Sequence, residues 1–435
     1  MHSISKKSGK FVCLNKIDKF YKLDYKGDYG FHDLLKFQAS LSPFDSESKI
    51  MGVTSDEAMR RFLGKKFYND KQIPLPLWSA NGGCDSFNSW NPVSKSWNFS
   101  RNFDYFYNTN EIIPSFWTGE TTEFKANSKF NIKGRVASAI VITHPKKALE
   151  ISFHNTCIKK HAPVESMSLV YLPYFFGDYS DPTIDKNNYW KIAPYYAFDG
   201  MNKNGVSISI NVSGNAENTH QKDAITLNYD KINLNSFALV RLILDYAKDV
   251  KDALELMSNF YLNDMSFEYN EPIHYQITDK TGTSVIVEFK EGFTMPTIVV
   301  TPEFVAKADK EHKYDIAGKN KKFIINENFN LSNLDANFGE AKFDSWTKLN
   351  KYMKNELPKK CLNKDLRWAE YYGRYFMVRA ELENYKGVVP NPMSILKNTR
   401  MLKWNTWSVV YDLTHLTTEV VYMQQYDKPS YTFSF

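Results

Sequence analysis

The hydrophobic pattern of the first 83 residues differs from that of the rest. Residues 31–41 (FHDLLKFQASL) and 55–67 (SDEAMRRFLGKKF) carry apolar residues at helical spacing. Ser55, followed by two acidic residues, is a typical helix start. The stretches IPLPLW and SANGG then supply prolines and glycines that end any helix. We therefore expect a propeptide-like N-terminal segment, residues 1–83, with a boundary between Gly83 and Cys84.

The pattern after this boundary is rich in short alternating runs typical of strands. They cover residues 135–144, 148–154, 200–214, 272–292 and 406–427, and several contain a turn signal such as KNG or DKTG. Two stretches have helical spacing instead, residues 235–260 and 367–382. Strands and helices come in blocks rather than in strict alternation, which predicts a layered α+β domain over residues 84–435.

Composition and charge narrow the class of protein. The chain has 435 residues, 43% of them hydrophobic and 15% aromatic, as expected for a globular protein with a large core. The net charge is +6, and residues 1–83 hold 14 basic and 9 acidic residues, so nearly all of the excess lies there. The remainder is close to neutral and shows no basic stripe, which argues against nucleic acid as a partner.

The sequence also bears on compartment and redox state. We find no apolar run long enough to span a membrane and no apolar core of a secretory signal, so a cytoplasmic location is favoured. Secretion stays open if a signal has been removed. The four cysteines are far apart and form no CxxC pair, so a disulfide framework is not expected. A homo-oligomer is left open.

Cys84 is the first candidate for chemistry. A thiol attacks as the thiolate, so it needs a base or a lowered pKa. A chain cut before Cys84 would give this residue its own base, an α-amine whose ordinary pKa is about 7.7–8.0. The two preceding glycines would let the sulfur bend back onto the Gly83 carbonyl. The competing interpretation is an inert buried cysteine, which residue type alone favours.

Other motifs give weaker signals. His154, Cys157 and His161 have metal-like spacing, but too few ligands for zinc, and we expect neither a metal nor another cofactor. The chain contains no HExxH, P-loop or GxGxxG sequence. A papain-like pairing of Cys84 with a distant histidine would require CGSCW-type surroundings, which are absent.

The residues around Cys84 resemble a known family. CDSF (84–87) followed by SRNFDYF (100–106) is similar to the opening of the choloylglycine hydrolase-like linear amide C-N hydrolases, a group of N-terminal nucleophile (Ntn) hydrolases. The group includes bile salt hydrolases and penicillin V acylases. The segment before Cys84 resembles the removable segments of acid ceramidase-type members. The resemblance runs with gaps from about residue 84 to the end and implies a four-layer αββα sandwich.

The resemblance assigns roles to several residues. It implies Cys84 as the nucleophile, with Arg101 stabilising the thiolate and Asp104 orienting the α-ammonium. The segment DGMNKNGVSISIN (199–211) implies Asn211 as the donor to the oxyanion. In the family a threonine–asparagine dipeptide follows on the next strand, where IVVTPEF gives Thr301 and Pro302 without the asparagine. FIINENF (323–329) gives Asn326 after a charged insertion, and we prefer Asn326 as the second asparagine.

The remaining assignments come from a helix and from aromatic residues. The helix YGRYFMVRAEL supplies the family's late arginine as Arg374, with Arg367 as the competitor. The aromatic residues Phe103, Phe106 and Trp117 would line an acyl pocket, although such residues are more often core.

These residues together predict an enzyme that hydrolyses a linear, non-peptide amide in a small N-acyl substrate. We expect self-cleavage at Gly83–Cys84 to activate it. Two alternatives remain open at this point. An acyltransferase would use an amine instead of water to resolve the thioester, and a non-catalytic binding protein would keep the fold without processing. The sequence does not identify the amide.

Overall fold

The structure is a computed structural model of the full chain. It describes residues 10–16, 20–41, 55–67, 83–104, 113–114, 121–122, 138–153, 156–171, 189–212, 231–262, 273–288, 298–300, 305–307, 325–326, 351, 355, 366–382, 391–401 and 405–435.

A ten-stranded sheet is the largest element within the described residues. Across the sheet, its strands are β1 (Lys10–Asn15), β2 (Phe20–Tyr25), β7 (Ser138–Thr143), β10 (Ser166–Tyr171), β11 (Ala197–Asn202), β12 (Val206–Val212), β15 (Ile273–Asp279), β16 (Ser284–Glu288), β17 (Ile298–Val300) and β18 (Val305–Lys307). β2 and β7 pair in parallel, and the other neighbours are antiparallel. Each predicted alternating run of this sheet forms a strand because its residues can present apolar side chains to a buried face.

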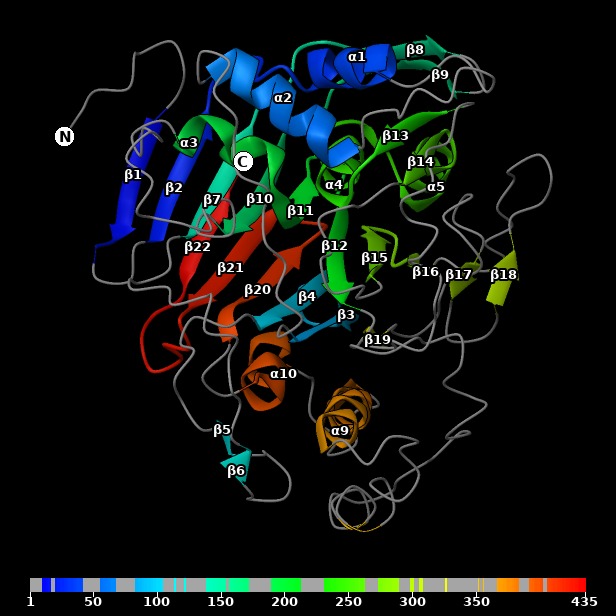
Figure 1. The fold of residues 1–435 in the computed structure, drawn as a ribbon. Coiled ribbons are helices and arrows are strands. Elements are labelled where there is room, and N and C mark those ends of the chain that lie inside the picture. Colours follow the sequence, from blue (N-terminus) through cyan, green and yellow to red (C-terminus); the bar gives the residue numbers. More distant parts are fainter. Residues whose placement is uncertain are drawn as a thin grey trace.

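A six-stranded antiparallel sheet lies beside the first (Figure 1). Its order is β19 (Ile325–Asn326), β3 (Gly83–Asn91), β4 (Ser96–Asp104), β20 (Asn405–Asp412), β21 (Thr417–Tyr422) and β22 (Tyr431–Ser434). The described residues also form three two-stranded pairs, β5 (Ile113–Pro114) with β6 (Thr121–Thr122), β8 (Leu149–Phe153) with β9 (Thr156–His161), and β13 (Ile232–Leu234) with β14 (Phe260–Leu262).

Helices cover the outer faces of both sheets (Figure 1). The described helices are α1 (Phe31–Leu41), α2 (Ser55–Phe67), α3 (Tyr189–Ile192), the 3-10 helix η3 (Ala193–Tyr195), α4 (Ser236–Tyr246), α5 (Val250–Ser258), α9 (Leu366–Leu382) and α10 (Pro392–Thr399). α4 contacts β11 and β12, whereas α10 contacts β4 and β20, and β12 contacts β3 between the two sheets. The layer order is therefore helix, sheet, sheet, helix, as the resemblance implies.

Apolar side chains fill the spaces between these layers. Phe99, Trp407 and Tyr411 of the six-stranded sheet join the large core that it shares with the ten-stranded sheet. A second cluster, which includes Phe87, Val378 and Leu396, fills the space toward α9 and α10. Alternate residues of one strand thus face different layers, and this decides where the polar residues of β3 and β4 point.

The N-terminal segment is part of the sandwich. Phe20 and Leu23 of β2 are fully buried, and the strand pairs along its whole length with β7. The Tyr29 hydroxyl donates to Asp245, which is also ion-paired with Arg241 of the same helix, α4. The two predicted N-terminal helices are confirmed as α1 and α2, while β1 and β2 were not predicted from the sequence.

The long helical stretch expected at 235–260 is two helices. Asn235 caps α4 by accepting from the Ala238 N–H, and α4 ends at Tyr246. Asp249 then caps α5 by accepting from the Asp252 N–H. The break follows from the cap itself, because an aspartate side chain competes for backbone donors and starts a new helix.

Two further observations concern membranes and metals. Within the part of the chain that the structure describes, no helix is both long and apolar enough to cross a membrane. Among the same residues no group of three or more metal-ligating side chains is found. Of the metal-like cluster noted in the sequence, Cys157 is exposed and His161 binds Asp252 at 2.9 Å, while His154 lies outside the described residues.

Candidate active site

The β3–β4 hairpin brings the predicted residues together. Its register pairs Gly83 with Asp104, Cys84 with Phe103, and Ser86 with Arg101. The Asn91 side chain stabilises the connecting turn by accepting from two backbone N–H groups. Cys84 and Arg101 are seventeen residues apart in sequence, and the hairpin brings them into direct contact.

The Cys84 sulfur is buried between two donors. Only 4% of Cys84 is exposed, and Arg101 Nη2 donates to Sγ over 3.3 Å. The backbone N–H of Asp104 also donates to the sulfur. Burial raises the pKa of the thiol, and the nearby Arg101 guanidinium opposes this rise. The thiol of the uncut chain is therefore neutral near pH 7, in a place where a thiolate would find two donors.

Arg101 is held in place by acceptors from the ten-stranded sheet. Its Nη1 donates to Asp199 Oδ2 at 2.5 Å and to the Phe198 carbonyl at 2.8 Å, and its Nη2 donates to the Ile210 carbonyl. Asp199 in turn accepts from the Trp407 indole at 3.1 Å. Burial raises the pKa of Asp199, and its pairing with Arg101 opposes this. The guanidinium is thus fixed beside the sulfur by contacts from both sheets.

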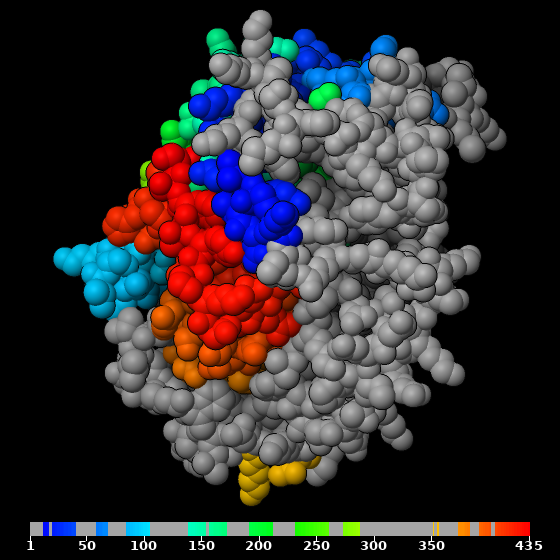
Figure 2. Space-filling view, turned by 90° about the vertical axis from the view of Figure 1, so that its left-hand side faces the viewer, coloured from blue at the N-terminus to red at the C-terminus, as the bar shows by residue number. Residues whose placement is uncertain are grey.

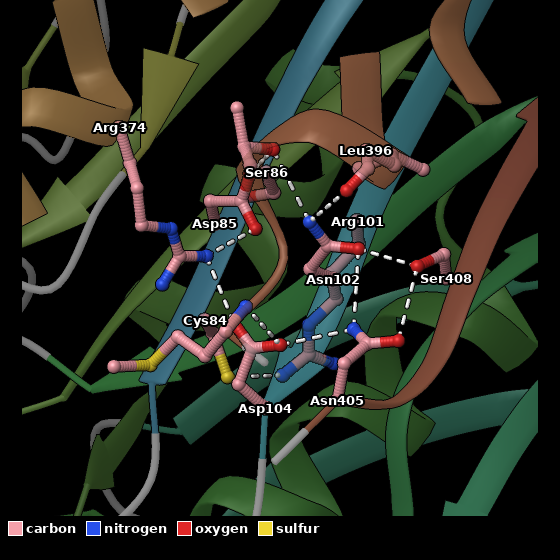
Figure 3. Close-up of polar contacts among 12 residues, drawn as sticks. Cys84, Asp85, Ser86, Arg101, Asn102, Asp104, Arg374, Leu396, Asn405 and Ser408 are labelled. Atoms are coloured by element: carbon pink, nitrogen blue, oxygen red, sulfur yellow. Dashed lines mark hydrogen bonds and ion pairs between the residues drawn. The ribbon is translucent and has the colours of Figure 1, made fainter. Parts of the chain in front are cut away.

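Asp104 approaches Cys84 from the other face of the sheet. Figure 3 shows Arg374 of α9 reaching between Asp85 and Asp104, two carboxylates on neighbouring strands. Arg374 Nη2 lies 2.8 Å from Asp104 Oδ2, and Asn405 donates to Asp104 Oδ1 at 2.9 Å. Burial raises the pKa of Asp104 to about 7, with Arg374 lowering it and Asp85 raising it further. Arg374 therefore bridges two carboxylates in a dry site.

Asn211 lies on β12, on the side of Cys84 that faces the ten-stranded sheet. Its amide nitrogen donates to Ser86 Oγ at 3.1 Å, and its amide oxygen accepts from Ser209 Oγ at 3.0 Å. The Ser86 hydroxyl itself donates to Gln276 at 2.7 Å. Ser86 and Cys84 are two residues apart on β3 and so share one face of the strand. The structure therefore places the predicted oxyanion donor on Ser86, two residues along β3 from the predicted nucleophile.

The other predicted residues differ in what the structure shows of them. Asn326 pairs with Ser86 at the edge of β3, so its backbone lies next to the nucleophile strand. Phe103 is buried and stacks on Trp407 with ring centroids 4.0 Å apart, under the Arg101 guanidinium. Its role in substrate binding stays a prediction. Phe106 and Trp117 lie outside the described residues.

Some residues of the site were not identified from the sequence. Asp85 follows the nucleophile directly, and Asp199 opens the segment used to assign Asn211, yet neither was given a role. Asn405 precedes the predicted closing hairpin by one residue. Each acts only through a partner distant in sequence, so adjacency to a motif was the only available signal.

A comparison with protein families matches a part of the chain that follows the β3–β4 hairpin in sequence. Residues 184–333 match the family model described as linear amide C-N hydrolases, choloylglycine hydrolase family. The chain resembles this family, as its motifs predicted. The matched residues include β11 and β12, which supply Asp199 and Asn211. The match supports a hydrolase of the choloylglycine hydrolase kind. A search of curated proteins gave no match.

A comparison with solved structures matches two hydrolases. A mutant conjugated bile acid hydrolase from Clostridium perfringens shares 14% identity, with 81% of this chain and 92% of that chain covered and a TM-score of 0.41. Penicillin V acylase from Agrobacterium tumefaciens shares 11% identity, with 81% and 86% covered and a TM-score of 0.39. The α+β class of this chain follows from its own sheets and helices.

Proposed function

We propose that this chain is a cysteine N-terminal nucleophile hydrolase that cleaves a linear C–N amide bond of an N-acyl substrate. One observation carries the proposal. The Cys84 sulfur accepts a hydrogen bond from a buried arginine at 3.3 Å, at the start of a strand in the central sandwich. The match of residues 184–333 to a family of linear amide hydrolases supports the same chemistry.

The surroundings of the sulfur indicate where its base would come from. Two groups among the described residues donate to Sγ, the Arg101 guanidinium and the Asp104 N–H, and each would stabilise a thiolate but cannot accept the thiol proton. An amino group on the same residue would accept that proton, and it exists only after the Gly83–Cys84 bond is broken. We therefore include self-cleavage in the proposal.

The proposed cleavage begins with attack of Sγ on the Gly83 carbonyl carbon. The C–N bond breaks, the Cys84 nitrogen takes a proton, and a thioester joins the sulfur to Gly83. Water then hydrolyses the thioester and leaves a free thiol and a free α-amine on Cys84. In turnover the amine takes the thiol proton, and the thiolate attacks the substrate amide. The leaving amine departs with a proton, and water resolves the second thioester.

Two side chains would serve the transition state in this proposal. Asn211 has two amide N–H groups, of which one donates to Ser86 in the structure. The second would stabilise the oxyanion, a contact whose loss costs about 2.7–4 kcal/mol in related cases. Arg101 would hold the thiolate, because Asp199 and two carbonyls already orient its guanidinium.

Intact-mass measurement of purified protein tests the proposal. We expect two polypeptides, residues 1–83 and 84–435, that together exceed the uncut chain by one water. Cys84→Ala should give a single species of 50.6 kDa without activity on a panel of N-acyl amides. Cys157→Ala, which removes an exposed thiol, is the matched control and should be processed and active. A single uncut species with Cys84-dependent amidase activity would contradict activation by cleavage. Full activity of Cys84→Ala would show that Cys84 is not the nucleophile.

A further inference from the structure

A row of hydrogen-bonded hydroxyl and amide side chains runs between the two sheets near Cys84. Every member is fully buried, with 0% of its surface exposed. The row, here called the hydroxyl–amide chain, consists of Ser209, Asn211, Ser86, Gln276, Ser284 and Thr278. A buried polar network whose members bond one another holds the groups that it contacts in fixed orientations.

The pleat of the ten-stranded sheet aligns most of these side chains. Ser209 and Asn211 are two residues apart on β12, and Gln276 lies opposite Ser209 on β15. Ser284 lies opposite Thr278 on β16. Because alternate residues of a strand face one side of a sheet, these five side chains all point into the same layer. Ser86 reaches that layer from the other sheet, on the strand that carries Cys84.

The hydrogen bonds around Asn211 run in one direction. The Ser86 hydroxyl has one proton, which it donates to Gln276 Oε1 over 2.7 Å. Ser86 therefore accepts from Asn211, whose Nδ2 lies 3.1 Å from Ser86 Oγ. The Asn211 amide oxygen accepts from Ser209 Oγ over 3.0 Å. The amide nitrogen of Asn211 is thereby directed toward β3 and its oxygen toward Ser209.

The opposite direction would be harmful to catalysis. If no acceptor stood at position 276, the Ser86 proton would be free to point at Asn211, whose amide would then turn its oxygen toward β3. An oxygen there would repel a developing oxyanion instead of binding it. Gln276 prevents this reversal because its Oε1 takes the Ser86 proton, while its Nε2 donates to Ser284 over 3.2 Å.

The space between the sheets is closed where their N-terminal and C-terminal strands meet. In Figure 2 the N-terminal strands (blue) lie against the C-terminal strands (red). Asn15 donates to the Tyr431 hydroxyl there, and Phe20 stacks on Tyr422 with ring centroids 4.5 Å apart. Since the hydroxyl–amide chain is itself fully buried, solvent does not readily replace a hydrogen bond that is removed from it.

We propose that Gln276 and Ser209 are positioning residues that hold the Asn211 amide with its nitrogen toward the reacting centre. The inference rests on the function proposed above, in which Asn211 stabilises the oxyanion. One N–H of Asn211 binds Ser86, and this contact fixes the plane of the amide and hence the direction of the second N–H. A donor that is already aligned costs no reorganisation when the transition state forms.

Steady-state kinetics on an N-acyl amide give the first test. Gln276→Leu keeps the approximate size of the side chain and removes its acceptor and its donor. We expect kcat to fall about tenfold to a hundredfold while KM changes by less than about threefold, because only the transition state carries the oxyanion. Ser209→Ala should lower kcat about threefold to tenfold, since it removes one neutral hydrogen bond to Asn211.

Ser207→Ala is the matched control. Ser207 is buried on the same face of β12 as Ser209, and its hydroxyl donates to the Thr278 carbonyl over 3.3 Å. We expect Ser207→Ala and Ser209→Ala to have similar unfolding temperatures, whereas only Ser209→Ala should lose kcat. If Gln276→Leu does not fold, this pair of single hydroxyl deletions carries the same comparison.

A double variant separates action through Ser86 from general damage to the core. Gln276 acts on Asn211 through Ser86 in this proposal. Ser86→Ala with Gln276→Leu should therefore have a kcat within about threefold of Ser86→Ala alone, whereas two independent losses would multiply.

The side-chain amide signal of Asn211 in nitrogen NMR gives a readout that needs no substrate. Chains labelled with ¹⁵N at asparagine are compared, and Asn211→Ser identifies the signal by its loss. In the parent the two N–H protons should exchange slowly with water, because the amide is buried. Gln276→Leu should shift the signal and speed this exchange by about tenfold or more. Ser207→Ala should leave both unchanged.

Three results would overturn the proposal. They are a parent-like kcat for Gln276→Leu, a multiplied loss when Gln276→Leu is added to Ser86→Ala, and an Asn211 signal that Gln276→Leu leaves unchanged. If the parent has no Cys84-dependent amidase activity, the function proposed above fails instead. The Asn211 signal then still decides the positioning, because exchange as slow in Gln276→Leu as in the parent would show that Gln276 does not hold this amide.

Discussion

The Asp104 carboxyl gives a quantitative prediction about stability. It is fully buried beside Asp85, and burial raises its pKa from 3.8 to about 7 even though Arg374 lies 2.8 Å away. We propose to compare Cys84→Ala, which we expect to stay uncut, with Cys84→Ala plus Asp104→Asn. The asparagine imitates the neutral carboxyl in size and cannot ionise, so the part of the stability difference that changes with pH reports the ionisation of Asp104.

The sign follows from proton binding. Between about pH 4 and pH 7 the unfolded Asp104 has lost its proton while the folded one keeps it, so the folded state binds more protons. The free energy of unfolding of the aspartate chain therefore falls as pH rises through this window, relative to the asparagine chain. A pKa increase from 3.8 to about 7 corresponds to about 4 kcal/mol. Relative to the aspartate chain, the Asp104→Asn chain should therefore gain most of this free energy of unfolding between pH 4 and pH 8.

Urea unfolding at half-unit steps from pH 4 to pH 8 measures this difference. Asp427→Asn, at an exposed aspartate, is the matched control for the loss of one negative charge. The reasoning is refuted if the Asp104→Asn chain gains no stability relative to the aspartate chain between pH 4 and pH 8. That result would mean that Asp104 is ionised in the fold and that its ion pair with Arg374 outweighs the cost of burial.

Two further predictions concern residues around this pair. Arg374→Met should lower the free energy of unfolding by about 3–5 kcal/mol in denaturant titrations, because it leaves two buried carboxyls without their shared cation. Arg379→Met is the control, since Arg379 is half-buried on the same helix. Equal effects of the two substitutions would contradict the bridging role of Arg374. Ser86→Ala should lower kcat for an N-acyl amide about tenfold to a hundredfold with little change in KM, because Asn211 loses the acceptor that orients its amide. Ser89→Ala removes a buried hydroxyl from the other face of β3, and an equal loss of kcat there would count against a positioning role for Ser86.

Local patterns predicted several of the helices and strands, whereas the four-layer order came from the family resemblance. Alternation in residues 272–292 and 406–427 predicted the hairpins β15–β16 and β20–β21, and helical spacing predicted α9. The strands β1 and β2 were missed because they lie in a basic region whose clearest signal is helical. β2 pairs with β7, more than a hundred residues away, and β1 pairs in turn with β2. Tertiary contact of this kind overrides local propensity.

Site residues could be predicted where they belong to one sequence motif that also folds as one unit. Cys84 and Arg101 share one hairpin, so their contact follows from the turn between them. Arg374 could be selected only through the family resemblance, and its bridge to Asp85 and Asp104 depends on how α9 packs against the sheet. The role of Asp199 could not be predicted from the sequence, because it depends on a side-chain contact with Arg101 between the two sheets.

The parallel pairing of β2 with β7 sets a condition on any maturation of this protein. All six residues of β7 are buried, and its outer edge is occupied by β2. Physical loss of the first 83 residues would uncover an apolar edge with unpaired backbone groups, the kind of surface that recruits other chains into aggregates. If the chain is cleaved before Cys84, both pieces would therefore have to stay associated as a two-chain molecule. Residues 84–435 expressed alone should be poorly soluble.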